Sequence, residues 1–121
     1  MAKDDYDVIL CRILIYFYAC KKRKILFDRE TFRKTVMKDV NEDYFTEILD
    51  MAQEEGFIKG LTIAKAWQGT YILASDIEEA EITAAGIRYL NENSRAKKVL
   101  QLLKDAAESI AQLAGLIGLL P

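Results

Sequence analysis

The residue types that most often carry enzyme chemistry are scarce in this chain. It contains no histidine, which removes the usual general base and the catalytic triads built around one. Its two cysteines, Cys11 and Cys20, lack the Cys-x-x-Cys spacing of zinc and dithiol sites. Neither a GxxxxGK[ST] nor a GxGxxG phosphate-binding loop is present. We therefore expect a protein that is not an enzyme and that holds neither a metal nor a cofactor.

The remaining reactive groups have structural explanations. Cys11 and Cys20 fall in one predicted helix, on opposite faces, so they cannot form a disulfide without breaking that helix. Buried structural thiols are the expected state of both. Adjacent acids occur at residues 42–43, 54–55 and 78–79, in predicted surface positions, and we expect them to be solvated charges rather than an acid–base pair.

Charge is distributed unevenly along a chain whose formal net charge is only −2. Residues 1–40 hold ten basic and six acidic residues, whereas residues 41–60 hold one basic and six acidic residues. The basic part could contact phosphates, and the alternative is that it stabilises a helix end and keeps the surface soluble. The possible nucleic-acid contacts are Lys21, Lys22, Arg23, Lys24, Arg33, Lys34 and Lys65.

Apolar periodicity and capping residues predict three helices in the first half of the chain. The first spans residues 6–22 and is apolar on more than one face, so we expect it to be covered on two sides. A short second helix is capped by Asp28 and runs to about Lys38, with Phe32 and Val36 inward. Asn41 caps a third, residues 42–55, which Gly56 ends. Its inward residues are Tyr44 or Phe45, Ile48, Leu49 and Ala52.

The pattern then changes to that of strands. Residues 57–63 and 70–73 are predicted to form a β-hairpin with Gly69 at the turn, followed by an acidic connector at 76–81. Thr83 caps a helix that runs to Asn93. Three helices, a hairpin and a further helix is the order of a winged helix-turn-helix domain, so we assign residues 1–93 to a mainly α winged-helix domain with a small β-hairpin.

A long C-terminal helix is predicted over the second region, residues 94–121. It begins near Ser94 and extends toward Leu120, with apolar residues at alternating spacings of four and three, typical of a coiled-coil seam. The seam residues are Val99, Leu103, Ala106, Ile110, Leu113 and Ile117. This seam favours a homodimer, and the alternative is that the helix folds back over the first helix of its own chain.

The ends of the chain bear on localisation. Asp4, Asp5 and Asp7 stand where a signal peptide would be basic, and the apolar stretch 109–121 is too short to span a bilayer. We expect a cytoplasmic protein without a membrane span.

Three stretches resemble the YjcQ-like family of small phage and prophage proteins of Gram-positive bacteria. They are Tyr-Asp-Val-Ile-Leu at 6–10 with Arg-Ile-Leu at 12–14, Glu-Glu-Gly-Phe-Ile-Lys-Gly at 54–60, and residues 82–94 followed by Lys97 and Lys98. With their connections they cover residues 6 to about 105. The resemblance implies a winged helix of mobile-element origin, and it transfers no activity or site residue.

A winged-helix protein usually binds DNA through its third helix, but the composition of the third helix in this chain disfavours such DNA binding. It carries six acids and neither Lys nor Arg, so phosphates would repel it. We therefore expect an interaction module that binds protein, with Glu47, Asp50, Glu54 and Trp67 as candidate contacts. Trp67 is either an exposed anchor at the wing tip or a packing residue. The alternative function is a DNA-binding regulator that uses the basic N-terminal third and the wing.

Overall fold

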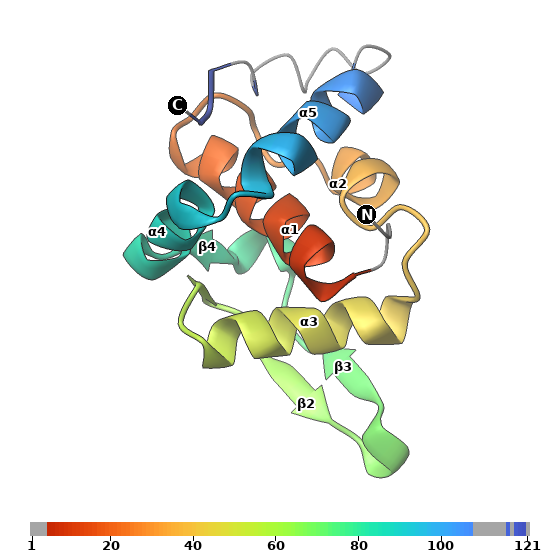
Figure 1. Ribbon diagram of the computed structural model, residues 1–121. Coiled ribbons are helices and arrows are strands. Elements are labelled where there is room, and N and C mark those ends of the chain that lie inside the picture. The colour runs from red at the N-terminus through yellow and green to blue at the C-terminus, as the bar shows by residue number, and fades with distance from the viewer. Residues whose placement is uncertain (1–4, 108–115, 117, 121) are drawn as a thin grey trace.

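The computed structural model describes residues 5–107, 116 and 118–120, and it has the predicted winged-helix order (Figure 1). The α-helices are α1 (Tyr6–Lys21), α2 (Arg29–Thr35), α3 (Glu42–Glu54), α4 (Ala84–Glu92) and α5 (Ala96–Ala107). The strands are β1 (Ile58–Lys59), β2 (Ile63–Lys65), β3 (Tyr71–Leu73) and β4 (Glu81–Ile82). Two short 3-10 turns, Trp67–Gly69 and Ile77–Glu79, interrupt the strand region. The mainly α winged helix-turn-helix prediction is confirmed.

Helix α1 forms the centre of the core, as its two apolar faces predicted. The described residues place α3, α4, α5 and β4 against it (Figure 1). Ten of its side chains are buried, including Ile9, Ile13 and Tyr16. Because a helix apolar around most of its circumference must be covered on several sides, this arrangement follows from composition.

The helix-turn-helix pair begins at the predicted caps. The Asp28 carboxylate accepts the Thr31 N–H at 3.2 Å, and the Asn41 side-chain oxygen accepts the Tyr44 N–H at 3.1 Å. Helix α2 is shorter than predicted, because it ends at Thr35 rather than near Lys38. The chain turns at Asp39, whose φ of 60° no α-helix accommodates.

The structure of helix α3 shows which of Tyr44 and Phe45 faces the core. Phe45 is buried and Tyr44 is exposed, so Phe45 is the inward residue. Gly56 follows the helix with a φ of +80°, as expected for the residue that ends it.

The wing is built differently from the single predicted hairpin. The predicted first strand, residues 57–63, divides into β1 and the start of β2, and β1 pairs with β4 instead of with residues 70–73. Only β2 and β3 form the tip, with Ile63 opposite Leu73. Two segments connect these two ladders: residues 60–62 lead from β1 to β2, and the longer segment 74–80 leads from β3 back to β4. The longer return includes the Ile77–Glu79 turn, so the predicted acidic connector at 76–81 is wrong at its end, where β4 begins.

The C-terminal helix packs within its own chain over the part that the structure describes. Helix α5 packs across α1, and Val99, Leu100 and Leu103 are each at most 5% exposed (Figure 1). The seam residue Ala106 lies in the last turn of α5, whereas Ile110, Leu113 and Ile117 fall outside the described residues. The described residues of α5 therefore share one core with the domain predicted over residues 1–93.

A continuous helix to Leu120 is wrong at its end. Gly118 has a φ of +76° in a turn, a conformation that terminates helices. Leu116 and Leu119 are buried, and Leu120 lines a small hollow with Leu90 and Asn93 beside the α4–α5 connection. Within residues 5–107, 116 and 118–120, no helix has the length and hydropathy needed to cross a lipid bilayer.

The Thr83 side chain connects the start of α4 to the residue after α3, so a substitution of Thr83 tests how much this connection stabilises the fold. Its hydroxyl accepts the Gly86 N–H at 3.1 Å and donates to the Gly56 carbonyl. We expect Thr83→Ala to lower the free energy of unfolding by about 1–2 kcal/mol, since it removes both bonds. Urea unfolding measures this loss. Thr83→Ser keeps the hydroxyl and should recover most of the stability, and a serine variant as unstable as the alanine variant would contradict the role of the cap.

Candidate functional site

The outward face of α3 combines acidic and apolar side chains. Phe45, Ile48, Leu49 and Ala52 turn inward and are buried, so the acids are carried on the other sides of the helix. Tyr44 and Met51, two turns apart, are each 37% exposed. Of the predicted contacts, Glu47 is half-buried on this helix. The face that a DNA-reading winged helix turns to the major groove is therefore acidic here, with two apolar side chains on it.

The wing lies against this acidic helix. The Lys65 ammonium on β2 is 3.6 Å from an Asp50 carboxylate oxygen and 3.5 Å from one of Glu54. It also lies over the Tyr71 ring, 5.7 Å from the centroid. Asp50 and then Glu54 raise the pKa of Lys65. The structure therefore joins a residue predicted to contact nucleic acid to two residues predicted to contact protein.

Trp67 is at the tip of the wing and is 93% exposed. The turn that carries it is tight, with φ values of 67° at Gln68 and 78° at Gly69. Of the two roles left open by the sequence, packing on the core does not fit this exposure. Exposed tryptophans are frequent binding anchors.

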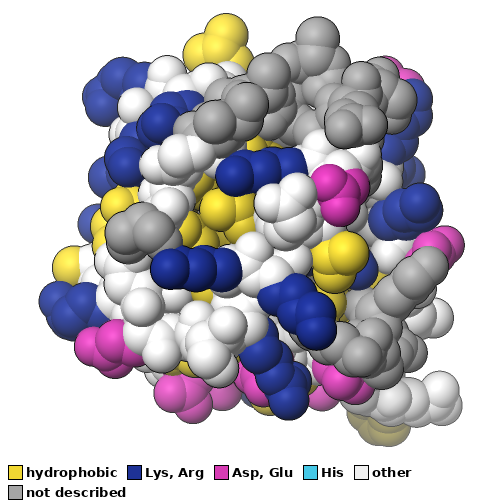
Figure 2. All heavy atoms as spheres, turned by 45° about the horizontal axis from the view of Figure 1, so that its top comes forward, with side chains coloured by type: hydrophobic (Ala, Val, Ile, Leu, Met, Phe, Trp, Pro, Cys, Tyr) yellow, Lys and Arg dark blue, Asp and Glu magenta, His cyan; other side chains and the backbone are white. Residues whose placement is uncertain are grey.

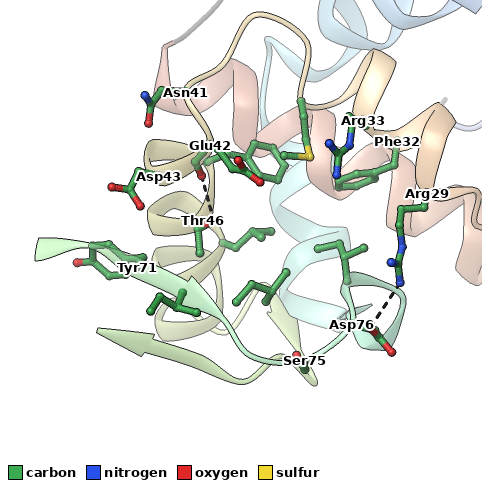
Figure 3. A pocket seen from close by; sticks show the side chains of 16 residues that line it. Arg29, Phe32, Arg33, Asn41, Glu42, Asp43, Thr46, Tyr71, Ser75 and Asp76 are labelled. Carbon is green, nitrogen blue, oxygen red and sulfur yellow. Dashed lines mark hydrogen bonds and ion pairs between the residues drawn. The ribbon is translucent and has the colours of Figure 1, made fainter. Parts of the chain in front are cut away.

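A groove of about 610 Å³ lies between α2, the N-terminal half of α3 and β3 (Figure 3). Its apolar surface comes from both helices and from the returning strand of the wing. Asp43 and Tyr71 lie at one end, and Arg29, Arg33 and Asp76 lie toward the other (Figure 3). The apolar lining residues are Phe32, Met37, Phe45, Leu49, Ile72, Leu73 and Ile77.

One wall of the groove is held by an ion pair that the sequence analysis did not identify. The Arg29 guanidinium donates to both Glu78 carboxylate oxygens, at 2.8 and 2.9 Å, and lies 3.4 Å from Asp76. The hydrogen bonds to Glu78, with its nearby charge, raise the pKa of Arg29 and lower that of Glu78. Because the partners are 49 residues apart in sequence, no local pattern could have revealed the pair.

The predicted basic contacts are spread over α1, the turn that follows it, α2 and β2. Lys21 lies 3.9 Å from Glu81, and Lys34 lies 2.9 Å from Glu30. Lys22 is placed over the Tyr18 ring, with 5.1 Å to its centroid. Lys65 is on the wing with the acids, and Arg33 lines the groove. The structure therefore does not bring the seven residues into one basic site.

A basic side of the molecule exists away from α3. Figure 2, in which the top of Figure 1 is turned toward the viewer, shows many Lys and Arg side chains spread over this face, with Asp and Glu along its lower rim and on its right side. Exposed Lys22, Arg23 and Lys24 follow α1, and Lys97 and Lys98 on α5 are exposed as well. Helix α5 thus adds basic residues that the predicted contacts did not include.

Comparison with protein families gives a match over most of the chain. The family model described as YjcQ protein matches residues 12–109. The chain belongs to the YjcQ family. No curated protein and no solved structure matches it significantly. Two of the stretches that carried the resemblance meet in the fold of this YjcQ-family chain, since residues 54–60 contain β1 and residues 82–94 begin in its partner β4.

The two cysteines of this YjcQ-family chain occupy structural positions on α1. Cys11 is buried and Cys20 is half-buried, and both are free thiols. Burial raises the pKa of Cys11 to about 11, with a further contribution from Asp7, and burial alone raises that of Cys20 to about 11. A thiol that stays protonated at neutral pH is a poor nucleophile. Among the described residues, no group of three His, Cys, Asp or Glu side chains is arranged to hold a metal ion.

Proposed function

We propose that this YjcQ-family chain is a non-enzymatic interaction module of phage or prophage origin that binds another protein through the outward face of α3 and the adjacent wing. The observation that carries the proposal is the makeup of that face, where Tyr44 and Met51 are exposed among acids. Exposed apolar side chains within a charged rim are typical of protein interfaces.

The electrostatics of α3 support protein over DNA as the partner of this face. DNA presents about one negative charge per 1.7 Å of its axis, and a groove-reading helix needs cations or hydrogen-bond donors toward it. The nearest wing cation, Lys65, is occupied by Asp50 and Glu54. An approaching phosphate would have to displace these carboxylates, whereas a basic segment of a partner protein would add to the existing network.

A DNA-binding regulator is the second candidate, and one specific observation favours it. Lys22, Arg23 and Lys24 directly after α1 are exposed, as are Lys97 and Lys98 on α5. Such a protein would bind DNA with these residues and leave α3 turned away.

We do not propose a homodimer through the α5 seam. Val99 and Leu103 are buried against α1 of the same chain, so these two seam residues are not available to a partner subunit. Leu102, 54% exposed, is a large apolar side chain that α5 still offers to solvent.

A DNA titration separates the two candidates. We expect a random DNA duplex to show no salt-sensitive binding to the wild-type chain in fluorescence anisotropy at low and moderate salt. If the second candidate is correct, binding will weaken steeply with salt, at a slope of about 0.9 per phosphate contact. The triple variant Lys22→Glu, Arg23→Glu, Lys24→Glu would then lose it. The matched double variant Lys97→Glu, Lys98→Glu tells whether α5 contributes.

The protein-binding proposal also has a direct test. The wild-type chain, a variant with Glu47→Lys and Met51→Ala, and the Lys97→Glu, Lys98→Glu variant are each used to purify partners from a lysate of the organism that encodes the chain. We expect a protein that wild type and the α5 variant retain and that the α3 variant loses. Equal recovery with all three chains would place the contact elsewhere and overturn the assignment to α3.

A further inference from the structure

One edge of β3 carries backbone groups that do not bond to β2. Ala66 donates its N–H to Thr70 at 2.7 Å, and Ala74 donates to Thr62 at 2.8 Å. In an antiparallel ladder the bonded pairs alternate, so Ile72 bonds to Ala64 between them. The N–H and C=O groups of Tyr71 and Leu73 therefore point away from β2. Among the described residues no strand other than β2 pairs with β3, and no backbone hydrogen bond from another element reaches these groups.

This free edge faces the groove described above. A groove that runs over the face of a strand is lined by alternate residues, because neighbouring side chains point to opposite sides. Here Tyr71, Ile72 and Leu73 all line it, which places the groove along the strand edge (Figure 3). Tyr71 and Leu73 are half-buried, whereas Ile72 is 51% exposed. An added strand would thus find backbone partners and apolar surface together.

The charges along the groove indicate what such a strand would carry. Asp43 lies at the end near Tyr71, and Arg33 lies toward the other end (Figure 3). Arg29 at that end is already paired with Glu78 and Asp76, so Arg33 is the cation there that an incoming carboxylate would meet. The apolar floor between the ends includes Phe32 and Leu49.

We infer that this groove binds an extended segment of a partner protein, which pairs with the outer edge of β3 as an additional strand. The segment has apolar side chains at alternate positions, a basic residue against Asp43 and an acidic residue against Arg33. Edge addition of this kind takes its affinity from main-chain bonds and its specificity from side-chain pockets. The inference rests on the proposed function, since it specifies the form of the protein partner.

The charges at the two ends favour a foreign segment over a second copy of this chain. Two copies paired through β3 would place their β2–β3 hairpins side by side, with the β3 strand of one copy (Tyr71–Leu73) against that of the other. This strand contains no charged residue that could meet Asp43 or Arg33. A polynucleotide would be repelled by Glu42 and Asp43, which both line the groove.

The test uses peptides selected from a displayed library of random twelve-residue sequences on the full-length purified chain. Backbone amide exchange is then followed by NMR with and without saturating selected peptide. We expect at least tenfold slower exchange at the Tyr71 and Leu73 amides and little change at Ile72, whose amide is already bonded within the wing. The selected sequences should alternate apolar residues between a basic and an acidic end.

Two variants at one position separate backbone pairing from side-chain contact. Leu73→Pro removes the outward N–H, which an edge strand tolerates because no bond to β2 is lost. Leu73→Ala keeps that N–H and removes most of the side chain. We expect the proline variant to bind the selected peptides at least tenfold more weakly than the alanine variant, with native-like circular dichroism in both. Equal affinities would overturn strand addition.

The other possible results of these experiments would each overturn strand addition or the foreign partner. A library that yields no binder, or peptides whose binding is lost with Glu47→Lys and Met51→Ala but kept with Leu73→Pro, overturns the inference. The second of these results leaves protein binding by α3 intact, whereas salt-sensitive DNA binding would overturn the proposed function itself. Protection of Tyr71 and Leu73 that rises with protein concentration in the absence of peptide would identify a second copy as the occupant and overturn the foreign partner.

Discussion

Gly86→Ala is expected to destabilise the protein by about 3 kcal/mol, although helix propensity alone favours alanine over glycine by about 1 kcal/mol. A Cβ at this position of α4 would lie 2.3 Å from the Phe57 carbonyl oxygen and 2.8 Å from Ile82 Cγ1. The carbonyl cannot retreat freely, because it accepts the Thr83 N–H at 3.0 Å. The Phe57 N–H is in turn bonded to Ala52 of α3, at 2.9 Å. Urea unfolding followed by circular dichroism measures the loss.

Gly56→Ala is the matched control for this prediction. Gly56 has a φ of +80° and nothing within 4 Å of an added Cβ, so its substitution costs only the conformational penalty of about 1–2 kcal/mol. At Gly86, in contrast, the backbone φ is not strained, but there is no space for an added Cβ. Losses of equal size at the two glycines would show that α4 can shift away from the strand, and would contradict the close packing.

Leu103→Ala is expected to lower the free energy of unfolding by about 2–5 kcal/mol, independently of protein concentration. Leu103 is 5% exposed and belongs to the core that joins α5 to α1, so truncation leaves a cavity inside one chain. If this residue instead formed a subunit seam, the melting temperature of the wild type would rise with concentration and the variant would lose that dependence. Thermal unfolding over a hundredfold range of concentration distinguishes the two.

Leu102→Ala supplies the comparison on the neighbouring residue. Its side chain is 54% exposed, so truncation should change stability by no more than about 0.5 kcal/mol. A loss as large as that of Leu103→Ala would show that the outer face of α5 is covered, and it would return the homodimer to consideration.

Local chemistry determined much of this fold. Asp28, Asn41 and Thr83 each cap a helix in the structure because a short oxygen-bearing side chain there can bond the first free N–H groups. The all-round apolar character of α1 required a central position. The family resemblance and the winged-helix order were likewise evident from residue patterns, as was the acidic character of α3.

The tertiary structure decided the features that depend on distant residues. Strand pairing of β1 with β4, the Arg29–Glu78 ion pair and the groove along β3 each join segments far apart in the chain, and no spacing rule relates them. Heptad spacing predicted an apolar seam on α5 correctly at Val99 and Leu103, but such spacing is the same whether the seam meets another subunit or α1. The sequence alone determined which side chains are apolar and where the helices begin. Which surface covers each apolar face was decided by tertiary packing, because an apolar face is buried by whichever other apolar face lies nearest to it in space.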